Sequence, residues 1–403
     1  MKKLFALSYI MLTVVMTALS GVPFVFLVPA GMSLGTAVDV SAVTAYADEH
    51  KRPLIATLVN GLDIAQDITV IPNVKNKIAL SKLSVGSGFR PYSATTEHKA
   101  GQLVFSDRYL ETKTGKRELL LDIRDFKDKH LAWRTSPGNR ASKTFQDMEF
   151  APFVWAEVIK GLQAEINNET AYFGFDKADA VAYDAGDAYV VGDYVTLAVN
   201  SVTEYFLCTA NAAIGDTPIT DPDKWENVTA RAVVKGLKYY IDELITGGFA
   251  VTTTGVINSG ATAVAAFKEI FRDMPVQYQK AGVIVHCSYT DAQYLLDGMD
   301  DTYKYTTADI SAAIGLGLIP IPGTLGKGFA KPATWLGSSR RLIAEPLAPG
   351  TAMGMCLVMG TDLLSDANDI KTKENLWTTE AGILVDLGFN VQDPEALRLG
   401  DQE

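Results

Sequence analysis

The sequence predicts an α+β protein, in which helices and strands occupy separate stretches of the chain. Residues 54 to 123, and the residues beyond Gly315, are rich in short apolar or alternating runs, which are typical of strands. Between these regions apolar residues recur every three or four positions, a spacing that predicts amphipathic helices. The regular alternation of strand and helix that a doubly wound parallel sheet needs is missing.

Length and composition allow two or three domains, or one elaborate domain with an insertion. The chain has 403 residues, of which 48% are hydrophobic and 21% charged, and its net charge is −11. This acidic balance gives no support to a nucleic-acid-binding surface, because contact with phosphates needs clustered Lys and Arg. Cys208, Cys287 and Cys356 lie far apart without metal-ligand spacing, so we expect buried free thiols.

Residues 1–53 are predicted to be a hydrophobic leader or arm. No charged residue occurs between Lys3 and Asp39, and this run exceeds the about 20 residues that cross a bilayer. The small residues around Ala47, in "AYADEH", resemble a signal-peptidase site, which predicts export or membrane anchoring. The other interpretation is an apolar arm that packs on neighbouring subunits, since Pro23 would interrupt a continuous helix. Both interpretations stay open.

Residues 54–124 predict a long β-ribbon. "ITVIPNV" and "GQLVFSDRYLETKTGKRELLLDI" flank the polar, turn-prone stretch "SGFRPYSATTEHKAG". The stretch from Gly101 to Phe145 has a net charge of +4, with its charges interleaved. We expect a solvated or subunit-facing strip there.

Three amphipathic helices are predicted in the middle of the chain. The first, "FAPFVWAEVIKGLQAEINNETAYFG", has Pro152 in its first turn and should form the backbone of a domain. The others are "ARAVVKGLKYYIDELITGG", capped by Gly247, and "AVAAFKEIFRDMP". "GVIVHCS" then reads as a buried strand and "TDAQYLLDGMD" as a helix that begins at Thr290. The inward residues of the three helices are Val154, Val158, Leu162 and Ile166; Val234, Leu237, Ile241 and Leu244; and Val264, Phe267, Phe271 and Met274.

Residues 175–230 interrupt this helical pattern. They carry several Tyr residues and a Trp among Gly-Asp turns, and their net charge is −8. Repulsion among so many carboxylates is tolerable only in water, so we infer a separate, exposed module.

No catalytic, cofactor or metal site is predicted, and we expect a protein that is not an enzyme. Of the four histidines, His286 lies in an apolar run, where a buried core histidine is the favoured interpretation. The glycines of "GLGLIP" and "GTLGKG" lack the spacing of nucleotide-binding loops and should form turns. "DLLSDANDIKTKE", from Asp362, lacks the pattern of a calcium loop and is predicted to be a solvated loop.

The order of these elements resembles the major capsid proteins of tailed phages with the Hong Kong 97-like fold. "MEFAPFVWAEVIKGLQAEINNETAYFG" is similar to the spine helix of that fold. "AVAAFKEIFRDMPVQYQKAGVIVHCSYTDAQYLLDGMDDTYKY" resembles its apical helices and strand, in the form found in phages of Bacteroidetes-type hosts. "SSRRLIAEPLAPGTAMGMCLVMGTDLL" and "GILVDLGFNVQDPEALRLG" resemble its terminal strands. The resemblance covers residues 55–175 and 231–400.

The resemblance implies a subunit that self-assembles into hexamers and pentamers of an icosahedral head shell, assembled in the host cytoplasm around DNA that it contacts without sequence specificity. Portal, scaffold or decoration proteins would be further partners. It divides the chain into a leader or arm (1–53), N-terminal arm and extended loop (54–124), peripheral domain with spine helix (125–174), inserted acidic β-module (175–230), apical domain (231–340) and C-terminal peripheral strands (341–403).

The inserted module resembles a chitin-type carbohydrate-binding module. Tyr189, Tyr194, Tyr205 and Trp225 fall in the order of that module, which makes them candidate residues for stacking on a host-surface glycan. The stretch where relatives display a stacking pair reads "CTANAAIGDTP" and contains no aromatic residue. The four aromatic residues are therefore also interpreted as the small core of the module.

Two other functions are compatible with the sequence. A secreted or surface carbohydrate-binding protein would explain the leader and the module, but not the spine-like helix. An encapsulin-like compartment shell would share the fold of the capsid. Closed icosahedral shells in the electron microscope would favour the capsid or the compartment, and a glycan-binding monomer would exclude both.

Overall fold

The computed structural model describes residues 41–86, 103–122, 150–303, 317–348, 351, 353–362, 370–374 and 378–402. The chain divides into two compact units, Met1–Val38 and Asp39–Glu403, and all described residues belong to the second. The expected leader up to residue 40, the predicted loop at 87–102 and the rest of the basic strip at 123–145 lie outside the described residues. The described chain is a mixed helix and strand protein, as predicted.

The first described element is a helix, α2 (Ser41–Asn60), which a short helix, α3 (Asp63–Asp67), follows. The prediction of strands from residue 54 onward is therefore wrong as far as Asp67. Ile55, Leu58 and Leu62 are buried at helical spacing, and this burial overrides the β-branched residues around them. The helix kinks at His50, where the ring of Pro53 crowds the preceding turn. Ala47, the predicted cleavage point, lies inside α2 and is fully buried.

Four strands in the order β1-β14-β16-β15 form one sheet, and a fifth strand, β4, also pairs with β16. The bounds are β1 (Thr69–Pro72), β4 (Lys113–Asp122), β14 (Leu357–Thr361), β15 (Ile370–Glu374) and β16 (Thr378–Val391). The long strand β16 pairs with β4 along one edge and with β15 and β14 in turn along the other. The predicted solvated loop from Asp362 is thus a strand from Ile370 on, because Ile370 packs into the core at 1% exposure.

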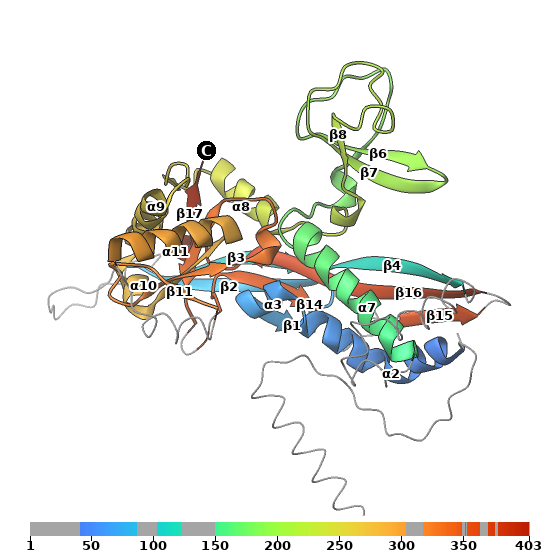
Figure 1. Ribbon diagram of the computed structural model, residues 1–403, viewed down its shortest axis with the longest axis horizontal. Helices are drawn as coiled ribbons and strands as arrows, with labels where there is room; N and C mark the ends of the chain where they lie inside the picture. Colours follow the sequence, from blue (N-terminus) through green and yellow to red (C-terminus); the bar gives the residue numbers. More distant parts are fainter. Residues whose placement is uncertain are drawn as a thin grey trace, which may run out of the picture. The chain divides into compact units, whose positions relative to one another are not determined.

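Helix α7 (Phe150–Glu165), which a π-helical turn (Ile166–Thr170) extends, packs with α2 against this sheet (Figure 1). The predicted apolar stripe of α7 is confirmed. Val154, Ile159 and Ile166 are buried, and Val158 and Leu162 are half-buried. The largest hydrophobic core of the molecule lies between these helices and the sheet.

A six-stranded sheet has the order β11-β12-β10-β13-β17-β9. Its strands are β9 (Val251–Thr253), β10 (Val283–Cys287), β11 (Ile319–Pro320), β12 (Gly328–Pro332), β13 (Leu342–Pro346) and β17 (Arg398–Asp401). Helices α9 (Gly260–Asp273) and α11 (Tyr289–Tyr303) pack on it, with α10 (Val276–Ala281) beside them (Figure 1). Every residue of β10 is buried, which confirms the predicted buried strand.

The helices of this region largely agree with the sequence. The inward residues predicted for α9 are all buried, and Ser259 and Thr262 form a capping box at its start. Helix α8 (Leu237–Thr246) ends at Gly247 as expected, but it begins later than Val234. Gly236 is extended there because its backbone lies against that of Gly174, where a Cβ atom would overlap.

Residues 181–227 contain a four-stranded sheet of their own, β5 (Val181–Ala182), β6 (Tyr194–Val199), β7 (Val202–Cys208) and β8 (Trp225–Asn227). One face of this sheet covers a separate small core of Val195, Phe206, Cys208, Ala212 and Trp225. We call residues 175–230 the acidic segment. The three cysteines are buried and free, as predicted, and burial raises the pKa of the Cys287 and Cys356 thiols.

Candidate assembly surface

A two-stranded ribbon carries the largest group of exposed apolar side chains among the described host residues. Its strands are β2 (Lys77–Val85) and β3 (Leu103–Glu111), and they pair only with each other. The predicted long β-ribbon is confirmed for these residues. In the antiparallel register Lys77 faces Glu111 and Val85 faces Leu103.

The outward face of the ribbon is apolar at the end far from its base. Leu83 pairs with Phe105 across the strands, and Val85 pairs with Leu103. These four side chains are 47%, 69%, 72% and 63% exposed, in that order. Grouped exposed apolar side chains are typical of a surface that contacts another protein, a membrane or a ligand, whereas single scattered ones are normal on a monomer. We call these four residues the ribbon patch.

The inward face of the ribbon is fixed to the body at its base. Leu80 and Leu110 are buried there with Val74 and Val358. Lys77 and Glu111 are the first cross-strand pair at the base of the ribbon. Lys77 Nζ lies 2.7 Å from Glu111 Oε1, and the hydrogen bond from Lys77 lowers the pKa of Glu111. The base is therefore part of the core, while the ribbon patch lies beyond it.

Lys82 anchors the ribbon further along. Its Nζ lies 2.7 Å from Asp393 Oδ1 and 2.6 Å from Glu395 Oε2, in the turn between β16 and β17. Burial lowers the pKa of Lys82, but the hydrogen bonds to these two carboxylates outweigh it and raise the pKa to about 12. Because Lys82 points inward, Leu83 on the next position must point outward.

The four predicted glycan residues lie on two different faces of the small sheet. Trp225 is 4% exposed in the core of the acidic segment, where Tyr189 packs edge-on against it with ring centroids 5.3 Å apart. Tyr194 and Tyr205 lie on the other face and pack against Phe175, with Tyr194 stacked at 4.1 Å. The structure thus brings the residues together in pairs and does not form one flat aromatic surface from all four. Burial raises the pKa of Tyr194.

A cleft of about 610 Å³ lies between the acidic segment and α8. Of the four predicted glycan residues, Tyr194 alone lines it, beside Phe175 and Asp242. The charged side chains in its walls all have ion-pair partners: Asp242 pairs with Lys238 and with Arg341, the latter at 2.9 Å. The other two, Asp179 and Glu243, pair with Lys235 at 3.6 Å and with Arg108 at 3.7 Å, respectively. Because these charges are compensated by their partners, the cleft favours no charged ligand.

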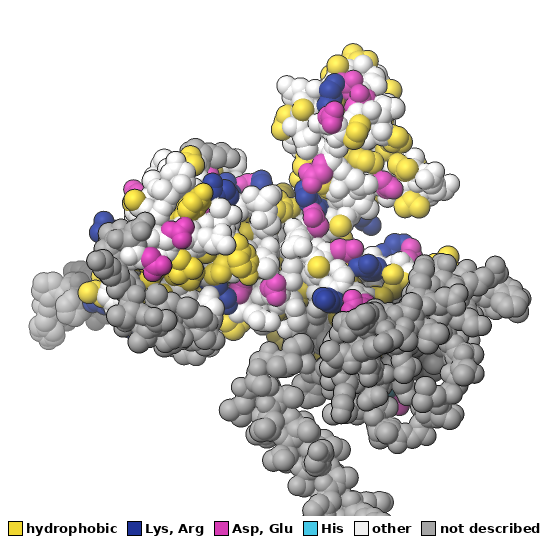
Figure 2. All heavy atoms as spheres, in the orientation of Figure 1, with side chains coloured by type: hydrophobic (Ala, Val, Ile, Leu, Met, Phe, Trp, Pro, Cys, Tyr) yellow, Lys and Arg dark blue, Asp and Glu magenta, His cyan; other side chains and the backbone are white. Residues whose placement is uncertain are grey.

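The acidic segment is joined to the host by a compact junction. Arg231 Nε lies 2.6 Å from Glu169 Oε2 of the π-helical turn, and its Nη2 lies 2.8 Å from Glu226 Oε1 of β8. The chain enters and leaves the acidic segment at this junction, where Gly236 N donates to Gly174 O at 2.8 Å. Figure 2 shows hydrophobic side chains interspersed with acidic ones over this segment, at the top of the view.

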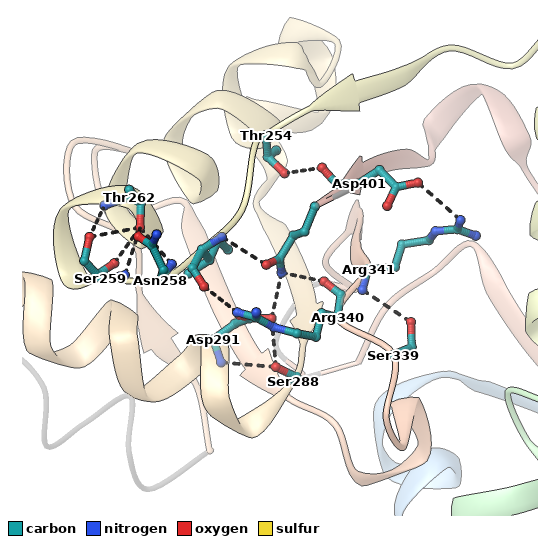
Figure 3. Close-up of polar contacts among 12 residues, drawn as sticks. Thr254, Asn258, Ser259, Thr262, Ser288, Asp291, Ser339, Arg340, Arg341 and Asp401 are labelled. Carbon is teal, nitrogen blue, oxygen red and sulfur yellow. Dashed lines mark hydrogen bonds and ion pairs between the residues drawn. The ribbon is translucent and has the colours of Figure 1, made fainter. Parts of the chain in front are cut away.

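A polar cluster fastens the last described residues to α11 (Figure 3). The Gln402 side chain donates to Asp291 Oδ2 at 2.9 Å and to Arg340 O at 2.6 Å, and it accepts from Ile257 N at 3.1 Å. Asp291, in the first turn of α11, is fully buried, accepts a hydrogen bond from the hydroxyl of Ser288 just before that helix, and forms an ion pair with Arg340. These contacts join the C-terminal strand region, α11 and the start of β13 within the fold.

His286 is a buried core histidine, as predicted. It is fully buried on β10, and its Nε2 lies 2.7 Å from Oε1 of Glu345, which is also fully buried. Glu345 was not singled out by the sequence, although a carboxylate inside the apolar run "LIAEP" is itself a signal. In "GTLGKG" Gly323 and Gly326 lie in turns at positive φ, as expected, whereas Gly328 begins strand β12.

The described residues contain no group of three or more His, Cys, Asp or Glu that could hold a metal ion. Among the helices of the same residues, none is both long and apolar enough to span a membrane.

Comparisons with known proteins give structural likeness only. No protein-family model matches the chain, and no curated protein is similar to it. Among solved structures, the chain is similar to a chain of the satellite phage P4 procapsid that includes the size determination (Sid) protein, with 13% identity and a TM-score of 0.43, over 87% of this chain and 99% of that one. It is similar to a chain of the capsid of Myoviridae phage XM1, with 12% identity and a TM-score of 0.45, over 85% and 92%. It is also similar to a chain of a virus-like particle from Pyrococcus furiosus, with 10% identity and a TM-score of 0.37, over 88% and 98%. At these scores the likeness carries no argument, and any function must be argued from the residues of this chain.

Proposed function

We propose that this chain is the major capsid protein of a tailed bacteriophage and that copies of it form an icosahedral head shell with the Hong Kong 97-like fold. The observation that carries the proposal is the ribbon patch. Leu83, Val85, Leu103 and Phe105 are exposed on a ribbon whose base alone is buried. A two-stranded ribbon is marginally stable in water, so its outer part requires a partner surface.

A second copy of the same chain is the partner that we propose. In a closed shell every copy offers the same ribbon and the same receiving surface, so one contact repeated around the symmetry axes covers every ribbon patch. Hexamers and pentamers would both use it. The function that we propose is structural and involves no catalysis.

The remaining parts take roles that follow the order of elements. We propose that α7 is the spine helix, that β2 and β3 belong to the N-terminal arm and extended loop (54–124), and that β9 to β12 with α9 and α11 form the apical domain (231–340). Strands β13 and β17, which complete the six-stranded sheet, lie in residues 341–403. Residues 125–174 and 341–403 would form the peripheral domain, and residues 1–53 an arm or leader. The proposed boundary between residues 53 and 54 divides α2, so the helix would connect residues 1–53 to the N-terminal arm and extended loop.

The acidic segment is proposed to be a built-in decoration on the outer surface of the shell. Its net charge of −8 favours solvent over the interior, where packaged DNA would repel it. Portal, scaffold or decoration proteins would be partners of the assembled shell. Binding of a host glycan by Tyr189, Tyr194, Tyr205 or Trp225 stays a prediction, and retention of the purified chain on chitin beads tests it.

Electron microscopy and analytical ultracentrifugation of the purified chain test the proposed function. Closed icosahedral particles are the expected result. A monomer at all concentrations that also binds chitin would contradict the capsid and support a carbohydrate-binding protein. Genes for portal and terminase next to this gene are expected for a phage, and their absence beside closed particles would favour an encapsulin-like compartment.

A further inference from the structure

The two large sheets are connected at one place by a buried carboxylate. Glu345, on β13 of the six-stranded sheet, is fully buried. Its Oε2 accepts hydrogen bonds from Cys356 N at 2.7 Å and from Leu357 N at 3.0 Å, where β14 of the five-stranded sheet begins. Its Oε1 contacts His286 on the neighbouring strand β10. We call this set of contacts the Glu345 clasp.

The clasp spans the point where the chain passes from one sheet to the other. Backbone bonds close the turn between β13 and β14, with Met355 N donating to Pro346 O at 3.1 Å. The Glu345 carboxylate adds two hydrogen bonds across this turn, to the backbone at the start of β14. These bonds restrict the direction of β14 relative to β13. Gly354 leaves room for the carboxylate, because a Cβ atom at that position would overlap it.

Stability alone is a poor explanation for the clasp. Removing a carboxylate from water costs several kcal/mol, and apolar residues of similar volume often stabilise a core as well or better. Buried polar groups with directional bonds can instead select one arrangement among several of similar energy. Here the arrangement selected is the orientation of two sheets.

We propose that the Glu345 clasp fixes the angle between the five-stranded and the six-stranded sheets, and that a shell of this chain takes its curvature from that angle. The first half concerns the single chain. The second half rests on the proposed function, because curvature requires a shell.

The variants that test the clasp differ in their ability to accept hydrogen bonds. Glu345→Leu fills the site without an acceptor and leaves the amides of Cys356 and Leu357 without a partner. Glu345→Gln keeps an oxygen for both amides, and its NH₂ group can donate to the ring of His286 in the other tautomer. Gly354→Ala displaces the carboxylate from the opposite side, so the test does not depend on the folding of one variant.

The angle itself can be measured on the unassembled chain. Spin labels at Thr253→Cys on β9 and Lys371→Cys on β15, both exposed positions, report one distance between the two sheets. We expect a single narrow distance distribution for the parent chain and for Glu345→Gln, and a broad one for Glu345→Leu and Gly354→Ala. Hydrogen exchange at Cys356 and Leu357 should become at least tenfold faster in the last two variants.

Shell diameter is the second readout. Cryo-electron microscopy should show one particle size for the parent chain and several sizes or open sheets for Glu345→Leu. If the distance distribution and the exchange rates of Glu345→Leu equal those of the parent, the clasp does not fix the angle. If Glu345→Gln behaves like Glu345→Leu, hydrogen bonding is the wrong explanation. If the parent chain forms no shells, the proposed function fails, while the distance measurement still decides the role of the clasp.

Discussion

Phe105→Ser should weaken assembly while the single chain keeps its fold. Phe105 is 69% exposed on the ribbon patch, so its removal takes little from the core of its own copy. A phenylalanine side chain presents about 200 Å², of which roughly 140 Å² remains available here; burial of most of it, about 120 Å², contributes about 3 kcal/mol at about 25 cal/mol per Å². At about 1.4 kcal/mol for each factor of ten, the assembly constant per contact falls about 100-fold.

Light scattering against protein concentration measures this change directly. The concentration at which particles first form should rise about 100-fold in Phe105→Ser, by the same free-energy conversion. Ile214→Ser is the matched control, because Ile214 is 70% exposed but lies on the acidic segment. Thermal unfolding of the unassembled variants should match the parent. Particles that form at the parental concentration in Phe105→Ser, or an equal loss in Ile214→Ser, would refute the assignment of the ribbon patch.

Three further predictions concern the anchoring of the parts. Lys82→Met should lower the free energy of unfolding by about 1 kcal/mol, with allowance for the exposure of one partner carboxylate. Because the pKa of Lys82 is raised to about 12, urea titrations should show the full difference below pH 10.5 and a shrinking one as the pH rises through 12. Replacing residues 176–230 by a two-residue turn should leave a folded, assembling chain less stable by about 2 to 3 kcal/mol, since Phe175 loses its cover; calorimetry and electron microscopy check this. Gly236→Ala should destabilise the chain by about 1 to 3 kcal/mol in chemical unfolding, because its Cβ atom would overlap Tyr172 O, whereas an unchanged midpoint would contradict the close approach.

Sequence patterns predicted those elements whose burial depends on local spacing. The stripe of α7, the inward residues of α9 and the apolar run of β10 need only a period of 3.6 or an unbroken apolar stretch. The pattern failed between residues 54 and 67, which were included in the strand-rich stretch that begins at Leu54. Helix α2 forms there because its apolar face covers the five-stranded sheet, whose strands lie mostly near the other end of the chain.

The candidate site was only partly predictable for a similar reason. The alternation in β2 and β3 predicts a ribbon, but both faces contain apolar residues, and the sequence does not show which of them meets solvent. The ion pair of Lys82 with Asp393 determines which face of the ribbon points inward, and the two residues are 311 positions apart in the sequence. Likewise, the order of Tyr194, Tyr205 and Trp225 along the chain says nothing about which face of a small sheet each occupies. Pairing of strands divides them.

The meeting of Gly174 and Gly236 has a consequence for the history and the use of this chain. Residues on either side of the acidic segment are hydrogen-bonded to each other. The backbone of the host domain is therefore joined at this point whatever is inserted between the two glycines. Evolution could therefore replace the acidic segment by another insertion without changing the packing of the host domain. The same position is a graft point for a foreign antigen or a fluorescent reporter whose termini lie close together, and in the proposed shell such a graft would be displayed once per subunit.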